Sequence, residues 1–488
     1  MNGHRVRLMD IVGEAGVTEE PTLGDSFSLD RDLLPALHPR FRVQPKDVDE
    51  VEEIVRWAND ASTPLVPLSS GEPHLRSASA PSAPGSVLVD LSGMKRIRKI
   101  DRRNRLALIE PGVTFGELQP ELAEAGLRLI TPLLPKQAKS VITSLLEREP
   151  IMSPRFQWNL LEPLRSLEIV WGHGEKFWSG SGFFHLENEE SWKQGLVPLN
   201  GPGPGQLDFY KMVSAAQGSM GIVTMASVKC EVLPEFRKTF LIPAAKLEDL
   251  IDPMYHLLRF RFGDELFIVN RNCLALMLTR ETNQMQSLKE TLPAWMMIAG
   301  VSGGHILAHE RVQAREADMR SIIEQAGLQM LTDVPGCSGS ELQDVILKPC
   351  EAPYWKLRYK GGSQEIFFLT HLERTPAFNS EMDELAIQFR YPPSDIGVYI
   401  QPLHQGVYCH CEFMLPFDRG IPEERARSES LFREASLRMF KQGAYFSRPY
   451  GIWAGMVYNG DARTTIVTQK VKQIFDPNNV MNPGKLCF

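Results

Sequence analysis

The chain has few cysteines, no long apolar segment and no excess of positive charge. Its seven cysteines are scattered and odd in number, which argues against a disulfide framework and favours a reducing compartment. No apolar run approaches the roughly 18 residues that span a bilayer, and the N-terminus lacks the apolar core of a signal peptide. A net charge of −7 argues against non-specific nucleic-acid binding, which depends on clustered Lys and Arg. We therefore expect a cytoplasmic protein without a membrane span or nucleic-acid partner.

What remains is an ordinary globular composition, with 43% hydrophobic and 23% charged residues in 488 positions. A chain of this length forms two or three domains. We expect an N-terminal arm over 1–40, a first domain over 41–236, a second domain over 237–440 and a C-terminal segment over 441–488. No internal repeat or low-complexity tract is present.

Strand and helix signals alternate in the first domain, which indicates a mixed α and β fold. Asp47 precedes apolar residues at helical spacing and is typical of an N-cap, and Gly126 is placed to end a later helix. Two alternating runs within Ser166–Trp178, joined by Gly172 to Gly174, predict a hairpin whose glycines supply positive φ angles. We expect helices over Asp47–Asn59 and Phe115–Ala125, and strands over Pro64–Leu68, Ser86–Leu91 and Leu106–Glu110.

In the second domain the pattern predicts an antiparallel sheet with helices on one face. The expected strands include Glu265–Val269, Trp295–Val301 and Gly406–Leu415. The expected helices lie near Lys246–Phe260, Leu307–Ala326 and Pro422–Gln442.

Three segments carry motifs beyond secondary structure. Pro64–His74 places a small-residue loop after a strand, where backbone N–H groups can face phosphate oxygens. Gln217–Val223 contains glycines where a ligand could approach the backbone closely. The chain closes on Ile474–Phe488, which reads IFDPNNVMNPGKLCF, an ordered ending instead of a frayed tail.

Together with Val87–Gln119 and Leu133–Gly182, these segments resemble, in order, the FAD-binding pattern of the vanillyl-alcohol oxidase and p-cresol methylhydroxylase superfamily. The resemblance covers about half of the chain well and the middle domain loosely. It implies an α+β fold, in which a two-subdomain FAD-binding domain of the p-cresol methylhydroxylase type is joined to an antiparallel-sheet substrate (cap) domain. The implied cofactor is FAD.

The resemblance also implies which residues contact the cofactor. Asn482 and Lys485 are expected to make polar contacts near the isoalloxazine. Relatives keep glycines where this chain has Glu149 and Pro150, so this loop is expected to be stiffer. Although His74 could attach the flavin covalently, its offset from the family's histidine favours non-covalent FAD. The expected cofactor-binding residues are Pro67, Ser69, Ser70, Gly71, Glu72, Pro73, His74, Leu134, Ser144, Glu147, Ser153, Pro154, Gly218, Gly221, Ile222, Val223, Asn482 and Lys485.

Three residues are candidates for catalysis. Arg448 and Tyr450 could anchor a substrate carboxylate or carry a proton. Asn159, or Gln157 if the alignment gap moves, stands where relatives have an acidic residue close to flavin N5, and a carboxamide cannot act as a base. Relatives that oxidise phenols hold the phenolate with two tyrosines and an arginine. Here Trp453 and Ala454 fall on a Tyr and the Arg, so that clamp is not reproduced.

A second branch of the superfamily binds a metal through two histidines and a glutamate. His404, His410 and Glu412 offer similar side chains, but FSRPYG stands where that branch has its E-H-G element. Alternation of these side chains along one strand is the simpler explanation, so we expect no metal.

The resulting expectation is an FAD-dependent oxidoreductase, a dehydrogenase or oxidase, that takes a hydride from a small aromatic or hydroxylated substrate onto flavin N5. The electron acceptor would be a protein, a quinone or oxygen, and the protein would form a homo- or hetero-oligomer. Alternatives are a flavin-bearing electron-transfer subunit of a larger complex, a D-2-hydroxy-acid dehydrogenase, and a scaffold that has lost FAD binding.

Overall fold

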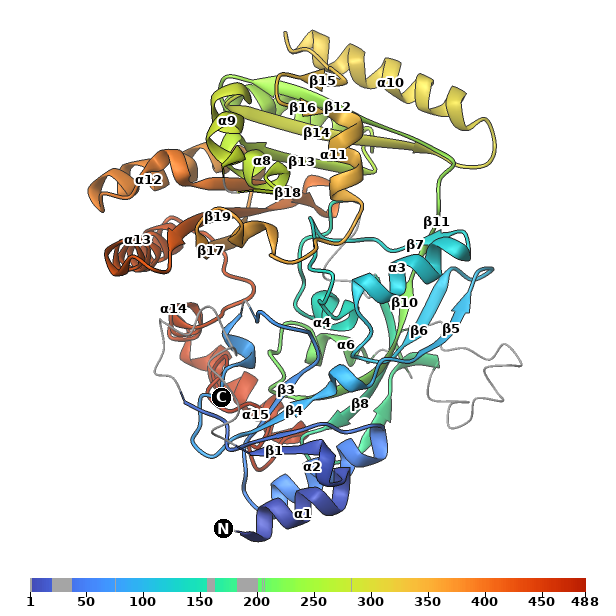
Figure 1. Cartoon of the computed structure of the whole chain (residues 1–488), viewed down its shortest axis with the longest axis vertical. Helices are drawn as coiled ribbons and strands as arrows, with labels where there is room; N and C mark the ends of the chain where they lie inside the picture. Colours follow the sequence, from blue (N-terminus) through green and yellow to red (C-terminus); the bar gives the residue numbers. More distant parts are fainter. Residues whose placement is uncertain are drawn as a thin grey trace.

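Two bodies are stacked along the long axis of the molecule (Figure 1). The structure is a computed structural model that describes residues 2–19, 37–74, 76–155, 163–181, 201–203, 205, 207–281 and 283–488. The lower body contains the first part of the chain and the C-terminal helices, and the upper body contains the middle of the chain. None of the described helices combines the length and apolar character needed to cross a membrane.

The first sheet has four strands in the order β1-β2-β4-β3, and β2, β4 and β3 run parallel to one another. Asp47 caps α2 as predicted, because its side chain accepts a hydrogen bond from the Glu50 amide. The apolar face of α2 packs on the sheet through Val51, Ile54 and Val55. The elements of this subdomain are α1 (Asn2–Val12), β1 (Val17–Glu19), β2 (Phe41–Val43), α2 (Val48–Asp60), β3 (Leu65–Leu68) and β4 (Val87–Asp90).

The first described residues differ from the expected arm. Helix α1 buries Leu8, Ile11 and Val12 in the same core as α2, and β1 pairs antiparallel with β2. Charged residues and glycines in this region concealed the short apolar stretch that contains Leu8, Ile11 and Val12. Residues 2–19 therefore belong to the first sheet and its helical layer.

The second sheet has five antiparallel strands in the order β5-β6-β10-β8-β9. A capping box between Thr114 and Glu117 begins α3, and Gly126 follows its end with φ of 71°. The elements are β5 (Ile97–Asp101), β6 (Leu106–Ile109), α3 (Phe115–Glu124), β7 (Leu127–Arg128), α4 (Val141–Leu146), β8 (Leu164–Trp171), β9 (Lys176–Trp178), α6 (Tyr210–Val213), β10 (Gly221–Lys229) and β11 (Glu231–Val232).

The hairpin predicted within Ser166–Trp178 is confirmed by the pairing of β8 with β9. Its two glycines have different roles. Gly174 has φ of 92° and supplies the positive angle that the turn requires. Gly172 lacks a side chain for another reason, because a Cβ there would lie 2.4 Å from Cβ of Asp476. The tip of the hairpin therefore packs against the C-terminal segment.

The upper body is built on a six-stranded sheet in the order β12-β14-β13-β18-β19-β17, and every neighbouring pair is antiparallel. With the two sheets below, it confirms the expected α+β class. The elements are β12 (Phe236–Ala244), α7 (Ile251–Arg259), β13 (Glu265–Asn270), α8 (Arg271–Leu278), α9 (Gln284–Thr291), β14 (Trp295–Gly303), α10 (Ala308–Gln325), β15 (Asp333–Val334), β16 (Cys337–Ser338), α11 (Gly339–Ile346), β17 (Gly361–Thr370), α12 (Thr375–Gln388), β18 (Gly397–Leu403), β19 (Tyr408–Asp418) and α13 (Pro422–Lys441).

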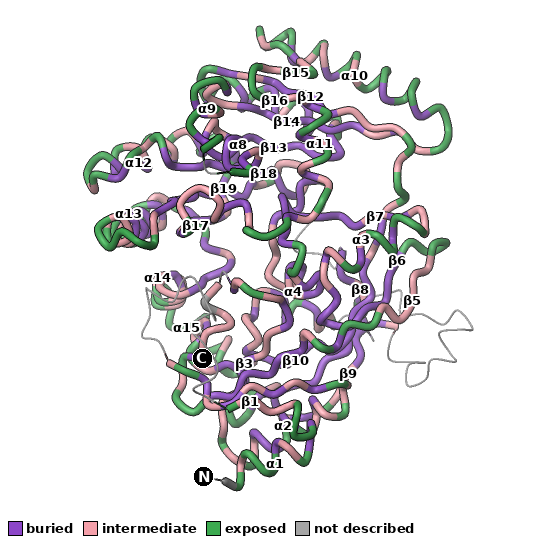
Figure 2. The backbone as a smooth tube through the Cα atoms, viewed as in Figure 1, coloured by how far each residue is buried: buried purple, intermediate pink, exposed green. Residues whose placement is uncertain are grey.

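Helices cover both faces of this sheet, so the expectation of helices on one face was wrong. One apolar core joins the sheet to α7, α10, α12 and α13, and a second core on alternate strand residues joins it to α8, α9 and α11. The central strands are accordingly buried along nearly their whole length (Figure 2). Such continuous burial is typical of a sheet covered on both sides.

The C-terminal segment returns to the lower body through α14 (Ile452–Tyr458) and α15 (Ala462–Phe475). Beyond α15, the Leu65 amide donates to Val480 O at 2.7 Å, and the Asn482 amide donates to Leu65 O at 2.8 Å. A parallel bridge joins Leu65 to Met481. The last residues thus extend the first sheet beside β3.

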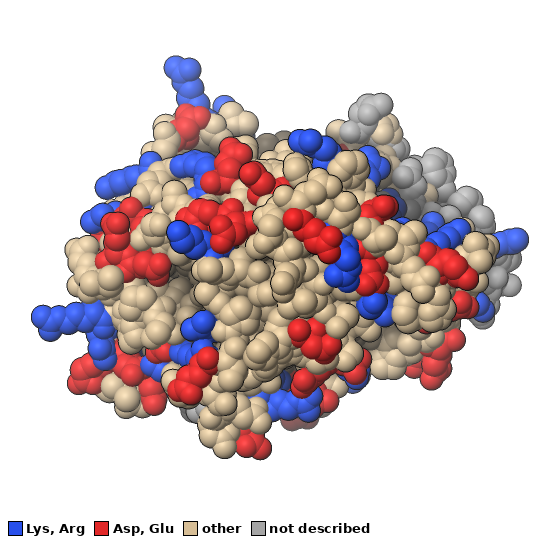
Figure 3. Space-filling view, turned by 90° about the horizontal axis from the view of Figure 1, so that it is seen from above, with Lys and Arg blue, Asp and Glu red and all other residues tan. Residues whose placement is uncertain are grey.

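Seen from the end that carries the upper body, acidic and basic side chains are interspersed (Figure 3). This face shows no broad field of one sign.

Candidate functional site

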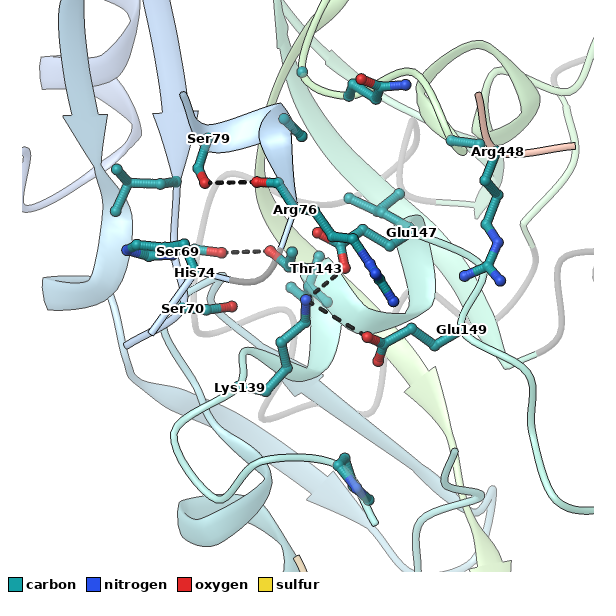
Figure 4. Close-up of a pocket in the computed structure, with 18 of the residues that line it drawn as sticks. Ser69, Ser70, His74, Arg76, Ser79, Lys139, Thr143, Glu147, Glu149 and Arg448 are labelled. Carbon is teal, nitrogen blue, oxygen red and sulfur yellow. Dashed lines mark hydrogen bonds and ion pairs between the residues drawn. The ribbon is translucent and has the colours of Figure 1, made fainter. Parts of the chain in front are cut away.

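A cavity of about 1560 Å³, including its open mouth, lies between the two lower sheets and the upper body. Its lower wall comes from the loop after β3, the segment before α4 and the start of β10. Its upper wall comes from the 354–356 segment, β18, β19 and residues 448–450. Figure 4 shows part of this cavity.

The loop after β3 is held by the segment that leads into α4. The hydroxyls of Ser69 and Thr143 hydrogen-bond to each other (Figure 4). The Ser140 amide donates to Ser70 Oγ at 3.1 Å. The Gly71 amide donates to Ala138 O at 2.9 Å. The loop is therefore shaped by protein contacts, and the Gly71 amide is already committed to one of them.

Lys136 supports the same loop from below. Its buried ammonium donates to Gly71 O at 3.1 Å and also to Pro73 O. Burial and the nearby Lys139 lower the pKa of Lys136 to about 8. Burial, followed by the charges of Lys136 and Lys139, lowers the pKa of His74 to about 4, so this imidazole is neutral at pH 7.

Lys139 points into the cavity between two carboxylates (Figure 4). It pairs with Glu147, and its Nζ lies 3.7 Å from Glu149 Oε1. Ser144 Oγ donates to the other oxygen of Glu149. Although burial opposes ionisation, Lys139 and Ser144 lower the pKa of Glu149, so it is a carboxylate. Glu149, which stands where relatives keep a glycine, thus places a charged group in the cavity, whereas only a stiffer loop was expected.

The glycines of the Gln217–Val223 segment, Gly218 and Gly221, line the cavity. A Cβ on Gly221 would lie 2.6 Å from Val170 O in β8, and one on Gly218 would lie 2.5 Å from Pro67 Cγ. Their lack of a side chain lets neighbouring chain segments approach each other. Ile222 and Val223 continue this wall with apolar side chains.

The predicted site residues Arg448 and Tyr450 both line the upper part of the cavity. The Arg448 guanidinium lies 4.2 Å from the centre of the Phe367 ring, and its Nη2 donates to His410 Nδ1 at 3.3 Å. Burial lowers the pKa of Arg448 to about 10, so it stays charged at neutral pH. Burial raises the pKa of Tyr450, which is therefore a neutral hydroxyl.

A chain of charged groups continues from His410 across the upper wall. Since Arg448 donates to His410 Nδ1, the His410 Nε2–H donates to Glu412 Oε2 at 2.9 Å. Burial is the main cause that lowers the pKa of His410 to about 4, so its ring is neutral. The other Glu412 oxygen accepts from Lys356, whose Nζ also lies 3.0 Å from Glu365 Oε1.

Arg76 joins this chain from the lower body, because its Nη2 lies 2.5 Å from Glu365 Oε2. Its guanidinium also lies 4.6 Å from the centre of the Phe367 ring. The residue that follows the loop after β3 is thus tied directly to the upper sheet.

The structure brings some of the predicted site residues together and places others elsewhere. Asn159 lies outside the described residues, as does its alternative Gln157. Gly71, Glu72, Pro73, Leu134, Ser144, Ser153, Pro154, Asn482 and Lys485 are not on the cavity wall. The residues that line it are Pro67, Ser69, Ser70, His74, Glu147, Gly218, Gly221, Ile222, Val223, Arg448 and Tyr450.

Asn482 and Lys485 fasten the C-terminal segment instead of lining the cavity. Asn482 Nδ2 donates to Ala78 O and Gln217 O, and Lys485 Nζ donates to Ala80 O at 2.7 Å. The closing motif predicted that the chain returns to the lower body. It did not predict the partners of Asn482 and Lys485, because these are backbone carbonyls from distant segments.

The described residues contain no group of three His, Cys, Asp or Glu side chains placed to hold a metal ion. Glu412 and His410 bind each other, and the cation between Glu412 and Glu365 is the Lys356 ammonium. His404 instead packs its ring near Tyr408.

Several cavity residues were missed by sequence reasoning. Lys136 and Lys139 stand more than 60 positions after the loop that follows β3, so only the folded chain shows that they lie beside it. Tyr354, Trp355 and Lys356 lie in a Pro-rich connection without a strong periodic pattern, so only the tertiary fold reveals them.

Comparisons with known proteins agree with this arrangement. Residues 39–144 match the family described as "FAD binding domain". D-2-hydroxyglutarate dehydrogenase of Stutzerimonas stutzeri (strain A1501) is 25% identical over 471 residues, covering 92% of this chain and 91% of that protein. The flavoprotein subunit of hydroxylating 4-cresol dehydrogenase from Pseudomonas putida is 27% identical over 477 residues, covering 92% and 87%.

Among solved structures, p-cresol methylhydroxylase with substrate bound superimposes with a TM-score of 0.80 at 19% sequence identity. The match covers 100% of this chain and 96% of that one. The similarity of fold therefore extends over both bodies, whereas the family match over residues 39–144 is confined to the lower body.

Proposed function

We propose that this chain, which belongs to the vanillyl-alcohol oxidase and p-cresol methylhydroxylase superfamily of flavoproteins, oxidises a small aromatic or hydroxylated substrate with bound FAD. One observation carries the proposal. A single cavity joins the loop after β3 to the buried Arg448 and Tyr450 of the upper wall. A cofactor held at the first end and a substrate held at the second would meet inside it.

The residues of the lower wall fit FAD. Lys136 supplies positive charge beside the small side chains of Ser69 and Ser70, which suits an anionic diphosphate, whereas the charge of Lys139 is balanced by Glu147 and Glu149. The same cavity extends from the loop after β3 to Arg448 and Tyr450, so a cofactor and a substrate can share it.

When bound, FAD supplies a hydride acceptor for a substrate carbon. The residues of the upper wall bind and orient that substrate. Arg448 would hold an acidic group by charge-assisted hydrogen bonds, and Tyr450 would donate a hydrogen bond from its neutral hydroxyl. Tyr354, Trp355 and Tyr399 give the same wall an aromatic surface on which a planar substrate can pack.

The cavity wall contains side chains of the kinds that hold a phenolate in relatives. Alignment placed Trp453 and Ala454 where relatives have a Tyr and the Arg. Tyr450 and Arg448, a few residues earlier, both line the cavity, and Tyr354 adds a second phenol. A clamp of this composition could therefore be supplied by residues from different positions in the sequence.

The first test is the visible spectrum of the purified protein, which should show the bands of oxidised flavin. Anaerobic addition of phenols, benzylic alcohols and 2-hydroxy acids should then bleach the flavin with one of these classes. Arg448→Met should weaken reduction by that class by about 10- to 100-fold, while the flavin spectrum is kept. Lys360→Met, which lies outside the cavity, is the control for Arg448→Met and should leave the reduction unchanged. Absence of flavin bands would contradict the proposal.

A second candidate is a flavin-bearing electron-transfer subunit of a larger complex. It is favoured by the relative from Pseudomonas putida, which is named as a flavoprotein subunit. In that case no substrate class would bleach the flavin, whereas a reduced partner protein would. We also propose that the electron acceptor is a protein or a quinone and that the protein is cytoplasmic. The protein would form an oligomer, and its domain boundaries would fall at residues 236 and 440.

A further inference from the structure

Lys356 lies in the upper wall of the cavity, on a short 3-10 turn over Trp355–Leu357, and is buried. Its Nζ lies 3.0 Å from Glu365 Oε1 and donates a hydrogen bond to Glu412 Oε1. Although burial opposes the charge, these two carboxylates raise the pKa of Lys356 well above its usual value. Lys356 is therefore a permanent cation, suited to binding an anion and unsuited to accepting a proton.

The carboxylates on either side are themselves fixed. The second oxygen of Glu365 lies 2.5 Å from Arg76 Nη2, and the second oxygen of Glu412 lies 2.9 Å from His410 Nε2. Each carboxylate thus bridges Lys356 to another group of the wall. If the ammonium left this position, each of these two buried carboxylates would lose one of its partners, which is costly.

An ammonium group has three N–H donors. Within the described part of the chain, the acceptors of Lys356 Nζ are Glu365 and Glu412. Because Lys356 also lines the cavity, its third donor has a ligand-accessible side on which to act.

We propose that Lys356 donates this third N–H to a carboxylate oxygen of the substrate, with Arg448 binding the other oxygen. Both cations belong to one connected wall, because Arg448 contacts His410 and His410 contacts Glu412. A carboxylate has two oxygens that need donors, and this wall offers two charged donors beside aromatic side chains. The inference rests on the proposed function and narrows its substrate to small aromatic carboxylates.

Benzoate and its neutral analogue benzamide are suitable probes, since they share shape and differ in charge. Their dissociation constants are measured on the purified holoprotein from the perturbation of the flavin spectrum. The unmodified protein is expected to bind benzoate about 10-fold or more tightly than benzamide. Lys356→Met should reduce this preference to about twofold or less, and Lys356→Arg should retain most of it.

Lys360→Met is the matched control, because Lys360 is a neighbouring, half-buried lysine that pairs with Asp395 and Glu424 outside the cavity. It should keep the full preference for benzoate. If Lys356→Met fails to fold, the double variant with Glu412→Gln removes one charge of each sign and repeats the measurement.

Equal binding of benzoate and benzamide by the unmodified protein, or an unchanged preference in Lys356→Met, would overturn the inference. Failure of the proposed function looks different, because the purified protein would then carry no flavin. In that event the same titrations are followed by the intrinsic tryptophan fluorescence, to which Trp355 of the cavity wall contributes. A preference for benzoate lost in Lys356→Met would still support the role of Lys356.

Discussion

The lowered pKa of Lys136 makes the affinity for FAD depend on pH. Without cofactor, burial and Lys139 bring this pKa from its usual 10.5 to about 8. If the diphosphate binds beside Lys136, its negative charge favours the ammonium and returns the pKa toward 10.5. Above pH 8, binding then requires uptake of a proton, so affinity must fall as pH rises.

The magnitude follows from the two pKa values. A difference of 2.5 units corresponds to about 3 kcal/mol, which is the most that this residue can contribute to the pH effect. Between about pH 7 and 9.5 the affinity should fall about 30-fold, with nearly all of the change above pH 8. Titration of flavin-free protein, followed by quenching of FAD fluorescence, measures this directly.

Two variants separate Lys136 from other groups. Lys136→Met should bind FAD more weakly at pH 7 and lose the decline with pH. Lys485 is the control, since burial also lowers its pKa to about 8 although it lies outside the cavity wall. Lys485→Met should therefore keep the decline. A wild-type affinity that is flat from about pH 7 to 9.5, or a decline that survives in Lys136→Met, would refute the reasoning.

Three further predictions concern the scaffold and the cofactor. Gly221→Ala places a Cβ 2.6 Å from Val170 O and should cost about 1–3 kcal/mol, seen as a lower melting temperature, whereas Gly93→Ala meets nothing within 4 Å and should change stability by less than ~0.5 kcal/mol. Thr114→Ala removes the capping box of α3 and should cost about 1 kcal/mol in urea unfolding, with an unchanged flavin spectrum. Acid precipitation should release FAD into the supernatant; flavin that stays with the pellet, but is released from His74→Ala, would instead show a covalent bond to His74.

Local features of the fold were predictable because their causes are local. The Asp47 cap, the turn at Gly174 and the helix end at Gly126 each depend on one residue and its immediate neighbours. Helices on both faces of the upper sheet were not predicted, because alternate strand residues pack on different helices and all look equally apolar in sequence.

The candidate site was predictable in its lower half and hidden in its upper half. Ser69, Ser70 and the start of β10 follow from motifs that keep chain order and spacing. Lys356 faces Glu412, 56 positions later, and Arg76 faces Glu365, 289 positions later. Such pairs leave no periodic signal, so only the folded chain shows that they form one wall.

The pairing of Leu65 with the far end of the chain has a consequence for synthesis in the cell. When the ribosome has translated residue 236, strand β3 still has an open edge, because its neighbour near residue 480 does not yet exist. At ~5–20 residues per second the remaining stretch takes roughly 10 to 50 s, during which this edge is available to wrong partners. A premature stop at codon 479 would remove these partners and leave that edge permanently open, although it would spare every residue on the cavity wall.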